Sequence, residues 1–265
     1  MKKIAVIGAG SLAHVFCRHF ADSLGGRCRL EGIMSRTYGK TLPLAEEYGA
    51  RACRTLEELL ALEPDYVVEF AGVAALKTYA PQVLRSTSLL AVSAGALADP
   101  DFRAAARSAA LAGGTRLIIA NGAIGGLDLL RTYALMGGAK LDFESRKAPG
   151  SLNGAPGLAG RELSKEHEEV AFSGPIEEAI REFPKNVNVA VAARFASGAD
   201  QSSMTLTSVP GLKETTHRIR IKNALLHAEL SFSSRPDPDN PRSSVSAAWS
   251  VLACLDELTA PIAFF

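Results

Sequence analysis

Short apolar runs alternate with longer amphipathic stretches over residues 4–120. Ile4 to Ile7 is wholly apolar, as in a strand buried on both faces, and Ala13 to Leu24 has the spacing of a helix. The same pattern predicts strands at 30–35, 65–69, 89–93 and 116–120. It predicts helices at 41–48, 74–85 and 99–113, and another that begins at residue 55. This alternation indicates a parallel sheet with right-handed crossover connections.

The first predicted strand is joined to the first predicted helix by Gly8-Ala9-Gly10-Ser11-Leu12-Ala13, a G-x-G-x-x-A pattern. Gly8 permits a tight turn, Gly10 lets a pyrophosphate approach the backbone, and the small Ala13 lets the helix lie close to the strand. Amide N–H groups and the helix dipole at such a turn favour an anion. We therefore expect Gly8, Gly10, Ser11 and Leu12 to contact a dinucleotide. The alternative is an ordinary strand–helix turn that contains glycines.

The pattern changes after residue 120. Strands are predicted at 140–147, 203–208, 215–222 and 224–231, helices at 175–183, 187–197 and 243–258, and loops at 150–160 and 235–241. We expect a dinucleotide-binding domain over 1–120 and a substrate and dimerisation domain over 121–242, with the C-terminal segment 243–265 packing back on the first. The predicted class is α/β, and the second domain is α+β with an open mixed or antiparallel sheet.

The end of the second predicted strand bears on which dinucleotide is used. In NAD sites an acidic residue at this end holds the ribose 2′-hydroxyl. Here the end reads Met34-Ser35-Arg36-Thr37, and Glu31 lies earlier, inside the strand. The Arg36 guanidinium is suited to a charge-assisted hydrogen bond with a 2′-phosphate. We expect NADP to be used at least as well as NAD, unless Arg36 is only a solvated loop charge.

Charge balance and cysteine spacing exclude several classes of protein. The 29 basic and 28 acidic residues give a net charge of +1, so no nucleic-acid surface is indicated. No segment reaches the roughly 18 apolar residues that span a bilayer. The four cysteines lack C-x-x-C spacing, which disfavours zinc and a disulfide framework and favours buried thiols in the cytoplasm. We expect no metal, no nucleic acid and no membrane as partners.

A histidine stands on an otherwise apolar strand face late in the chain. Within residues 215–222, His217 shares one face with Ile219 and Ile221, and the other face is basic. An imidazole with an ordinary pKa of about 6.5 is suited to proton transfer at neutral pH. A hydrogen-bonded core histidine would give the same pattern.

Several segments, in this order, resemble the aspartate dehydrogenase family. They are VIGAG at 6–10, VEFA at 68–71, SAGALAD at 93–99, NGAIGGLD at 121–128, FPKNVNVA at 183–190, His217, and NPRSS at 240–244. The glycine fingerprint is generic, whereas GAIGGLD together with FP-x-N-x-N-V is specific. The resemblance implies a Rossmann domain paired with an α+β domain. It also implies oxidation of L-aspartate with NAD or NADP to iminoaspartate, which yields oxaloacetate and ammonia or enters quinolinate and NAD biosynthesis.

The resemblance also implies roles for particular residues. His217 matches the catalytic histidine, a general acid and base; Ala123, by its amide, and Asn188 match cofactor contacts, and we expect Ala71 at the cofactor as well. Candidates for the groups that hold the substrate carboxylates are Asn121, Lys147, Lys185, Asn186, Arg242 and Ser244.

The expected partners are a small amino-acid substrate and a second copy of the chain, as a homodimer. Two other functions fit the same sequence features. One is a dehydrogenase of another amino or hydroxy acid, as homoserine dehydrogenase is, and the other is a non-catalytic NADP-binding sensor.

Overall fold

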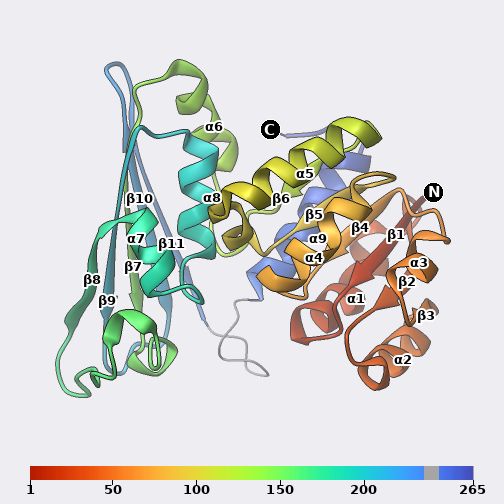
Figure 1. Ribbon diagram of the computed structural model, residues 1–265, viewed down its shortest axis with the longest axis horizontal. Helices are drawn as coiled ribbons and strands as arrows, with labels where there is room; N and C mark the ends of the chain where they lie inside the picture. The colour runs from red at the N-terminus through yellow and green to blue at the C-terminus, as the bar shows by residue number, and fades with distance from the viewer. Residues whose placement is uncertain (236–244, 265) are drawn as a thin grey trace. The chain divides into compact units, whose positions relative to one another are not determined.

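The computed structural model describes residues 1–235 and 245–264, and the chain folds into two compact units (Figure 1). The first comprises Met1–Gly122 with Val245–Phe265, and the second comprises Ala123–Ser244. The first contains β1 (Lys2–Ile7), α1 (Ser11–Leu24), β2 (Cys28–Met34), α2 (Tyr38–Glu47), β3 (Arg51–Cys53), α3 (Leu56–Leu60), β4 (Tyr66–Glu69), α4 (Val73–Val83), β5 (Ser88–Ala91), the 3₁₀ turn η1 (Ala94–Ala98), α5 (Pro100–Gly113), β6 (Leu117–Ile119) and α9 (Ser246–Thr259).

The strands of the first unit form one parallel sheet in the order β3-β2-β1-β4-β5-β6. This is the strand order of a Rossmann fold, in which the chain reverses direction across the sheet between β1 and β4. The apolar run in β1 is buried on both faces, as predicted. Ile4 and Val6 belong to one core cluster, and Ala5 and Ile7 belong to the other.

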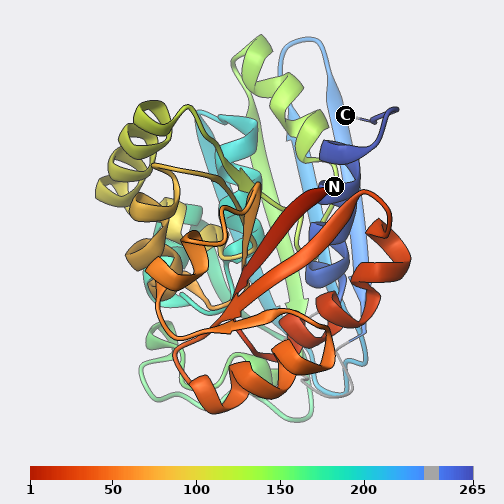
Figure 2. The same ribbon diagram turned by 90° about the vertical axis from the view of Figure 1, so that its right-hand side faces the viewer.

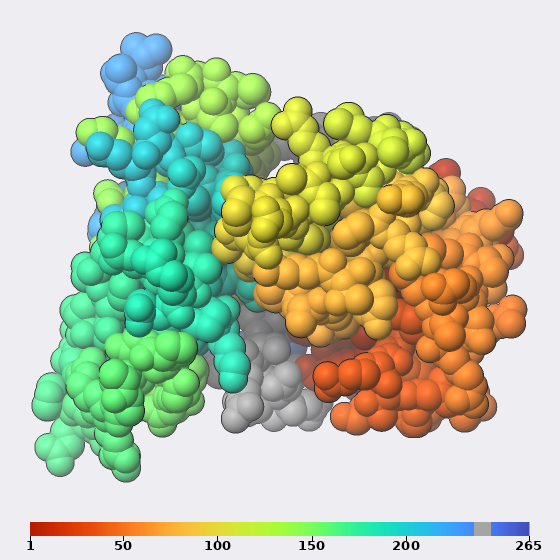
Figure 3. All heavy atoms as spheres, in the orientation of Figure 1, coloured from red at the N-terminus to blue at the C-terminus, as the bar shows by residue number. Residues whose placement is uncertain are grey.

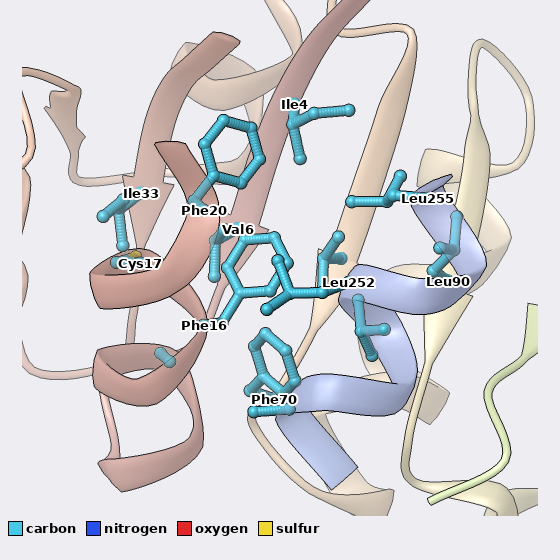
Figure 4. Close-up of a cluster of buried hydrophobic side chains, with 14 of the residues drawn as sticks. Ile4, Val6, Phe16, Cys17, Phe20, Ile33, Phe70, Leu90, Leu252 and Leu255 are labelled. Atoms are coloured by element: carbon cyan, nitrogen blue, oxygen red, sulfur yellow. The ribbon is translucent and has the colours of Figure 1, made fainter. Parts of the chain in front are cut away.

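Helices cover both faces of this sheet (Figure 2). The cluster that contains Ala5 and Ile7 draws its other side chains from α3, α4 and α5, and Figure 3 shows α4 and α5 covering the sheet on that side. On the opposite face the cluster joins α1 and α2 to α9. Phe16 of α1 lies beside Leu252 and Leu255 of α9 (Figure 4), so the end of the chain completes the core of the first unit.

Truncation of Leu252 should therefore destabilise the first unit. The side chain is 2% exposed among aromatic and aliphatic neighbours, so Leu252→Ala leaves a cavity in the core. We expect a loss of roughly 3 kcal/mol in the free energy of unfolding, measured by urea denaturation. The exposed Leu111 of α5 provides the control, since Leu111→Ala should change stability by less than about 0.5 kcal/mol. Equal losses in the two variants would contradict the packing of α9.

The second unit is built on a mixed sheet. It contains α6 (Leu127–Met136), β7 (Lys140–Lys147), the 3₁₀ turns η2 (Pro149–Ser151) and η3 (Pro156–Leu158), β8 (Glu169–Pro175), α7 (Ile176–Glu182), α8 (Asn188–Ser197), β9 (Gln201–Ser208), β10 (Thr215–Lys222) and β11 (His227–Ser234). The strand order is β11-β10-β7-β9-β8, and only the β7–β9 pair is parallel. Helices α6, α7 and α8 lie on one face of this sheet (Figure 1), which we call the inner face.

The structure adds three elements that the sequence pattern did not predict: β3, α6 and β8. It also corrects the last strand, which begins at His227 rather than at 224. The reason is a turn in which the Asn223 side chain accepts hydrogen bonds from the N–H groups of Leu225 and Leu226, at 2.9 and 2.8 Å. The predicted loop at 150–160 contains η2 and η3. Most of the predicted 235–241 loop, and all of the NPRSS segment, lie outside the described residues.

The described residues contain neither a membrane-spanning helix nor a cluster of metal ligands. None of the helices there is long and apolar enough to cross a bilayer. No three His, Cys, Asp or Glu side chains there converge in a way that could hold a metal ion. The four cysteines are free thiols: Cys17, Cys28 and Cys53 are buried and Cys254 is half-buried. Burial raises the pKa of Cys17 to about 12, so this thiol is unreactive at neutral pH.

Candidate functional site

The glycine turn after β1 has the geometry that a dinucleotide requires. Gly8 has φ +128°, and its N–H donates to the carbonyl of Met34 at 2.7 Å. A Cβ at Gly8 would lie 2.9 Å from the backbone of Phe70, so only glycine fits there. A Cβ at Gly10 would meet nothing within 4 Å, which leaves open space beside the start of α1. Gly10 contributes no capping side chain and the first turn of α1 holds no acidic residue, so the positive end of the helix dipole is available to an anion.

A buried carboxylate shapes the neighbouring loops of the first unit. Glu69, at the end of β4, is 1% exposed. Its Oε1 atom accepts hydrogen bonds from the N–H groups of Ala71 and Gly72, both at 2.6 Å, and from the Ser93 hydroxyl at 3.0 Å. The Ser93 N–H also donates to Oε2 at 3.3 Å. Burial raises the pKa of Glu69, and these hydrogen bonds oppose that rise. One side chain thus connects the loops that follow β4 and β5.

The end of β2 carries exposed cations and no free acid. Glu31 forms an ion pair with Arg29, and Arg36 lies exposed two residues beyond the strand. Cys53 of β3 pairs with Met34, which brings Arg54 to the same edge of the sheet. The Arg54 guanidinium stacks on the Tyr38 ring at 3.7 Å from its centroid. No acidic side chain in the described residues forms an ion pair with the guanidinium of Arg36 or Arg54, although the Glu58 carboxylate accepts a hydrogen bond from the Arg54 backbone N–H at 2.7 Å. The two guanidinium groups are therefore suited to a phosphate.

The other expected residues of the first unit differ in what they offer. Ser11 and Leu12 begin α1 and are half-buried. Ala71 is exposed, and because its N–H is bonded to Glu69, only its carbonyl and methyl groups are available to a ligand. Asn121 is exposed after β6. The following residue, Gly122, donates its N–H to the Ser250 hydroxyl at 3.0 Å.

His217 lies on the inner face of the second sheet and is 3% exposed. Its Nδ1 atom is 3.1 Å from the hydroxyl of Ser145, the residue opposite it on β7, and its ring lies 5.6 Å from the ring of Phe143. Burial and the positive charge of Lys147 lower the pKa of His217 to about 3. The imidazole is therefore neutral at physiological pH, and the Ser145 contact fixes its orientation.

Polar side chains gather at one end of this otherwise apolar inner face. Along β7 the buried Leu141 and Phe143 give way to Ser145 and then Lys147. Along β9 the buried Met204 and Leu206 give way to Ser208, which pairs with Lys147. The Ser208 hydroxyl is buried and has no hydrogen-bond partner in the described residues. Burial lowers the pKa of Lys147 to about 8. We call His217, Ser145, Lys147 and Ser208 the polar cluster.

One further segment of the second unit lies close to His217, and another is held to the loop that follows β7. A Cβ at Gly125 would approach the ring of Phe232 to 3.3 Å, and Phe232 is the residue opposite His217 on β11. The loop that contains Ala123 therefore lies against the strand beside the histidine. Near the end of β7, the buried Asn186 donates its side-chain amide to the Ser151 carbonyl at 2.9 Å.

That hydrogen bond occupies one donor of the Asn186 amide, and the N-cap of α8 is the next residue, Val187. Asn188 is the first residue of α8, is half-buried and has interactions of its own. Lys185 is exposed, and Arg242 and Ser244 lie outside the described residues.

A cleft of about 640 Å³ lies beyond the ends of β7 and β9. Its walls include Pro149, Asn153, Arg161, Lys165 and Pro210. Neither His217 nor Lys147 lines this cleft, so it is separate from the polar cluster.

Sequence reasoning missed the roles of four residues. Ser145 is a polar residue on the face of β7 that otherwise carries the apolar Leu141 and Phe143, so the alternation alone could have singled it out. Ser208 ends β9 in the same way. Glu69 ends an apolar strand, which is an unusual place for a carboxylate. Arg54 gave no such signal, because its position depends on the β2–β3 pairing.

Two protein families match this chain in adjoining regions. The NAD-binding domain of homoserine dehydrogenase matches residues 8–120, and the C-terminal domain of aspartate dehydrogenase matches residues 128–258. The chain is 32% identical to the L-aspartate dehydrogenase of Methanospirillum hungatei over 263 residues, which is 99% of this chain and 98% of that protein. It is 35% identical to the enzyme of Ruegeria pomeroyi, over 98% of this chain and 94% of that one.

Solved structures show the same fold. Aspartate dehydrogenase from Thermotoga maritima matches with a TM-score of 0.77 and 25% identity over the whole of both chains. A hyperthermophilic archaeal homoserine dehydrogenase in complex with NADPH matches with a TM-score of 0.60 and 12% identity, over 95% of this chain and 96% of that one, which is a likeness of fold. The predicted class, a Rossmann domain with a second domain on an open mixed sheet, is confirmed. By its identity over nearly full length to two aspartate dehydrogenases, this chain belongs to the aspartate dehydrogenase family.

Proposed function

We propose that this protein oxidises L-aspartate with NAD or NADP to iminoaspartate, which hydrolyses to oxaloacetate and ammonia, and that His217 is its general base. Membership of the aspartate dehydrogenase family supports the reaction. The observation that supports the role of His217 is a neutral, oriented imidazole placed next to a lysine at the polar end of an apolar sheet face.

The first unit suits the dinucleotide. A pyrophosphate fits the open space beside Gly10, in a turn where residue 8 must be glycine. The start of α1 has no side-chain cap, so its backbone end also favours the anion. Ser11, Leu12 and Ala71 border the same edge of the sheet. When a nicotinamide is bound, it supplies the acceptor for the hydride that leaves the substrate Cα.

His217 handles the protons of this reaction. In the tautomer whose Nδ1–H donates to the Ser145 hydroxyl, Nε2 is the unprotonated nitrogen and can accept a proton. The substrate amine must lose its extra proton before nitrogen can push electrons toward Cα, and a neutral imidazole can take that proton. Once that proton has passed to solvent, the same nitrogen can accept a proton from the water that attacks the imine, and return it to the leaving ammonia.

The substrate is expected to contact some of the residues named from the sequence. Asn121 and Lys185 are exposed and remain candidates for its carboxylates. Asn186 has one amide N–H committed to Ser151, which leaves its other N–H and its carbonyl oxygen for a ligand. Ala123, whose loop lies against the strand beside His217, and Asn188 remain proposed cofactor contacts.

Loss of Arg36 should weaken the binding of NADP selectively. The Arg36 guanidinium is exposed at the end of β2 without an acidic partner in the described residues, and a charged hydrogen bond is worth roughly 1.5–3 kcal/mol. Arg36→Ala should therefore raise the Kd of NADPH at least about tenfold and change the Kd of NADH little. Isothermal titration with both nucleotides measures the ratio. An unchanged NADPH/NADH ratio would make Arg36 a solvated loop charge.

A panel of substrates tests the proposed function. Initial rates with NAD and with NADP should be highest for L-aspartate among the common amino acids and 2-hydroxy acids. A higher rate with another amino or hydroxy acid would move the protein to a different dehydrogenase activity. Binding of either nucleotide with no turnover of any substrate would indicate a sensor.

The assembly and location of the protein are also proposals. The face of the second sheet opposite the inner face is charged, with ion pairs that join β10 to β7 and β11. An open sheet of this kind favours a homodimer. Four unpaired thiols favour a reducing compartment, so we place the protein in the cytoplasm.

A further inference from the structure

Lys147 is a half-buried cation that lacks a counter-ion. It ends β7 on the inner face, and no carboxylate in the described residues pairs with it. Its neighbours on that strand, by contrast, are paired: Glu144 binds Arg220, and Arg146 binds Glu168. Burying an ammonium without an anion is costly, so the position favours an anionic ligand over a purely structural role.

A second polar group without a partner lies beside it. Ser208 pairs with Lys147 across the parallel β7–β9 ladder, so the two side chains leave neighbouring strands on the same face. The Ser208 hydroxyl is fully buried and unbonded in the described residues. A buried hydroxyl that lacks a partner usually indicates a missing ligand or water. An ammonium and a hydroxyl on one face match the acceptor oxygens of a carboxylate.

His217 lies diagonally across from Lys147. The residue opposite His217 is Ser145, and Lys147 is two positions further along β7, so its Cβ lies about 7 Å away by strand geometry. An anion held by Lys147 is thus placed beside the proposed base. It would also offset the positive charge that weakens the affinity of His217 for a proton.

We propose that Lys147 and Ser208 form the subsite that binds a carboxylate of the substrate. The proposal rests on the function proposed above and extends it by naming the group that recognises the acid. Lys147 is then a better candidate for the carboxylate-binding group than Lys185, which is exposed.

One other charged group reaches this corner of the inner face, because Glu169 of β8 is the residue opposite Ser208. Its carboxylate forms an ion pair with Arg161 and accepts a hydrogen bond from the Ser164 N–H. The charged residues of β7, β10 and β11 beside His217 and Lys147 lie on the opposite face, and β9 has no titratable side chain. The helices on the inner face carry exposed or half-buried charges and one buried phenol. These groups are Asp128, Arg131 and Tyr133 on α6, Glu177, Glu178, Arg181 and Glu182 on α7, and Arg194 on α8. The titratable groups at this corner are therefore His217 and Lys147, together with Glu169, whose carboxylate is paired with Arg161 rather than with Lys147.

Succinate provides the test, because it is a dicarboxylate without an amine and is not turned over. Isothermal titration is carried out on the purified full-length protein with excess NADP, at pH 7 and pH 9. Since the pKa of Lys147 is about 8, wild-type affinity should fall about tenfold between these pH values. Lys147→Met should bind at least about tenfold more weakly than wild type at pH 7 and show no fall. The exposed Lys140 at the other end of β7 gives the control, and Lys140→Met should behave as wild type.

Lys147→Arg keeps the charge at both pH values and should lose the fall in affinity between pH 7 and pH 9. This variant decides the matter if Lys147→Met does not fold. Wild-type succinate affinity in Lys147→Met, or a tenfold fall in Lys147→Arg, would overturn the subsite.

Two smaller ligands identify which carboxylate is bound. L-alanine lacks the side-chain carboxylate of aspartate, and β-alanine lacks its 1-carboxylate. Weaker binding of L-alanine to Lys147→Met assigns the 1-carboxylate, and weaker binding of β-alanine assigns the side-chain carboxylate. If Lys147→Met binds L-alanine and β-alanine as tightly as the wild-type protein does, the proposal is contradicted. Because succinate is not oxidised, a protein that binds it through Lys147 but oxidises no aspartate would retain the subsite and lose only the proposed function.

Discussion

Replacing His217 by alanine should lower kcat for aspartate oxidation by about 100-fold or more and leave nucleotide affinity within about twofold. The imidazole is the one titratable group in the polar cluster that is neutral at pH 7, because burial and Lys147 lower its pKa to about 3. Without it, no side chain of the cluster can take the proton of the substrate amine. Steady-state kinetics measures kcat, and titration with NADPH measures the affinity.

Two controls separate chemistry from folding. Ser145→Ala removes the partner of Nδ1 but keeps the ring, so kcat should fall much less than in His217→Ala. The His227 ring is exposed at the start of β11, and His227→Ala should be as active as wild type. Near-normal kcat in His217→Ala would remove this residue from the mechanism.

His217 also links stability to pH. Its pKa in the folded protein, about 3, is below the ordinary value, so the unfolded chain binds the extra proton first. The free energy of unfolding should therefore decrease as the pH falls from about 6.5 toward 3. His217→Ala should flatten this part of the curve, which urea denaturation at several pH values measures. An unchanged slope would mean that His217 titrates normally.

Replacing Glu69 by alanine should destabilise the first unit by about 4 kcal/mol and weaken nucleotide binding. Four hydrogen bonds converge on this carboxylate, and alanine leaves three backbone N–H groups and the Ser93 hydroxyl without their acceptor. The loops after β4 and β5 would lose their common anchor at the edge where the dinucleotide is proposed to lie. Thermal unfolding and titration with NADPH measure the two effects.

Glu69→Gln distinguishes the shape of the loops from their charge. Glutamine keeps one carbonyl oxygen, which can take the place of Oε1 and accept its three hydrogen bonds. Its NH₂ group would then face the N–H of Ser93, so that two donors meet. We expect a smaller loss of about 1–2 kcal/mol. Glu46 on α2 is exposed and serves as a surface control, so Glu46→Gln should leave stability unchanged. Wild-type stability in Glu69→Ala would contradict the proposed anchoring role.

The local features of the first unit could be read directly from its sequence. The run from Ile4 to Ile7 is apolar because β1 is buried on both faces, and Gly8 is forced by the backbone of Phe70. Pro100 begins α5 where expected, after Asp99 accepts hydrogen bonds from the first turn. The β3 strand was not predicted, because three residues are too few to show an alternating pattern.

The candidate site could be read only in part, because its assembly depends on strand register. Alternation placed His217 on an inner face, but only the pairing of β10 with β7 brings Ser145 and Lys147 to it. Only the pairing of β7 with β9 brings Ser208 to Lys147. Register between distant strands is set by the whole sheet, so no short window of sequence contains it. The same limit hid the approach of Arg54 to Tyr38.

The consumption of oxaloacetate with and without ammonium tests the central claim most directly. A protein that interconverts aspartate and oxaloacetate through an imine must incorporate ammonia before NADPH or NADH can reduce its substrate. We predict that the purified protein oxidises NADPH in the presence of oxaloacetate only when ammonium is added, and that the product is L-aspartate. Oxidation of NADPH by oxaloacetate at the same rate without ammonium, with a hydroxy acid as the product, would contradict the account.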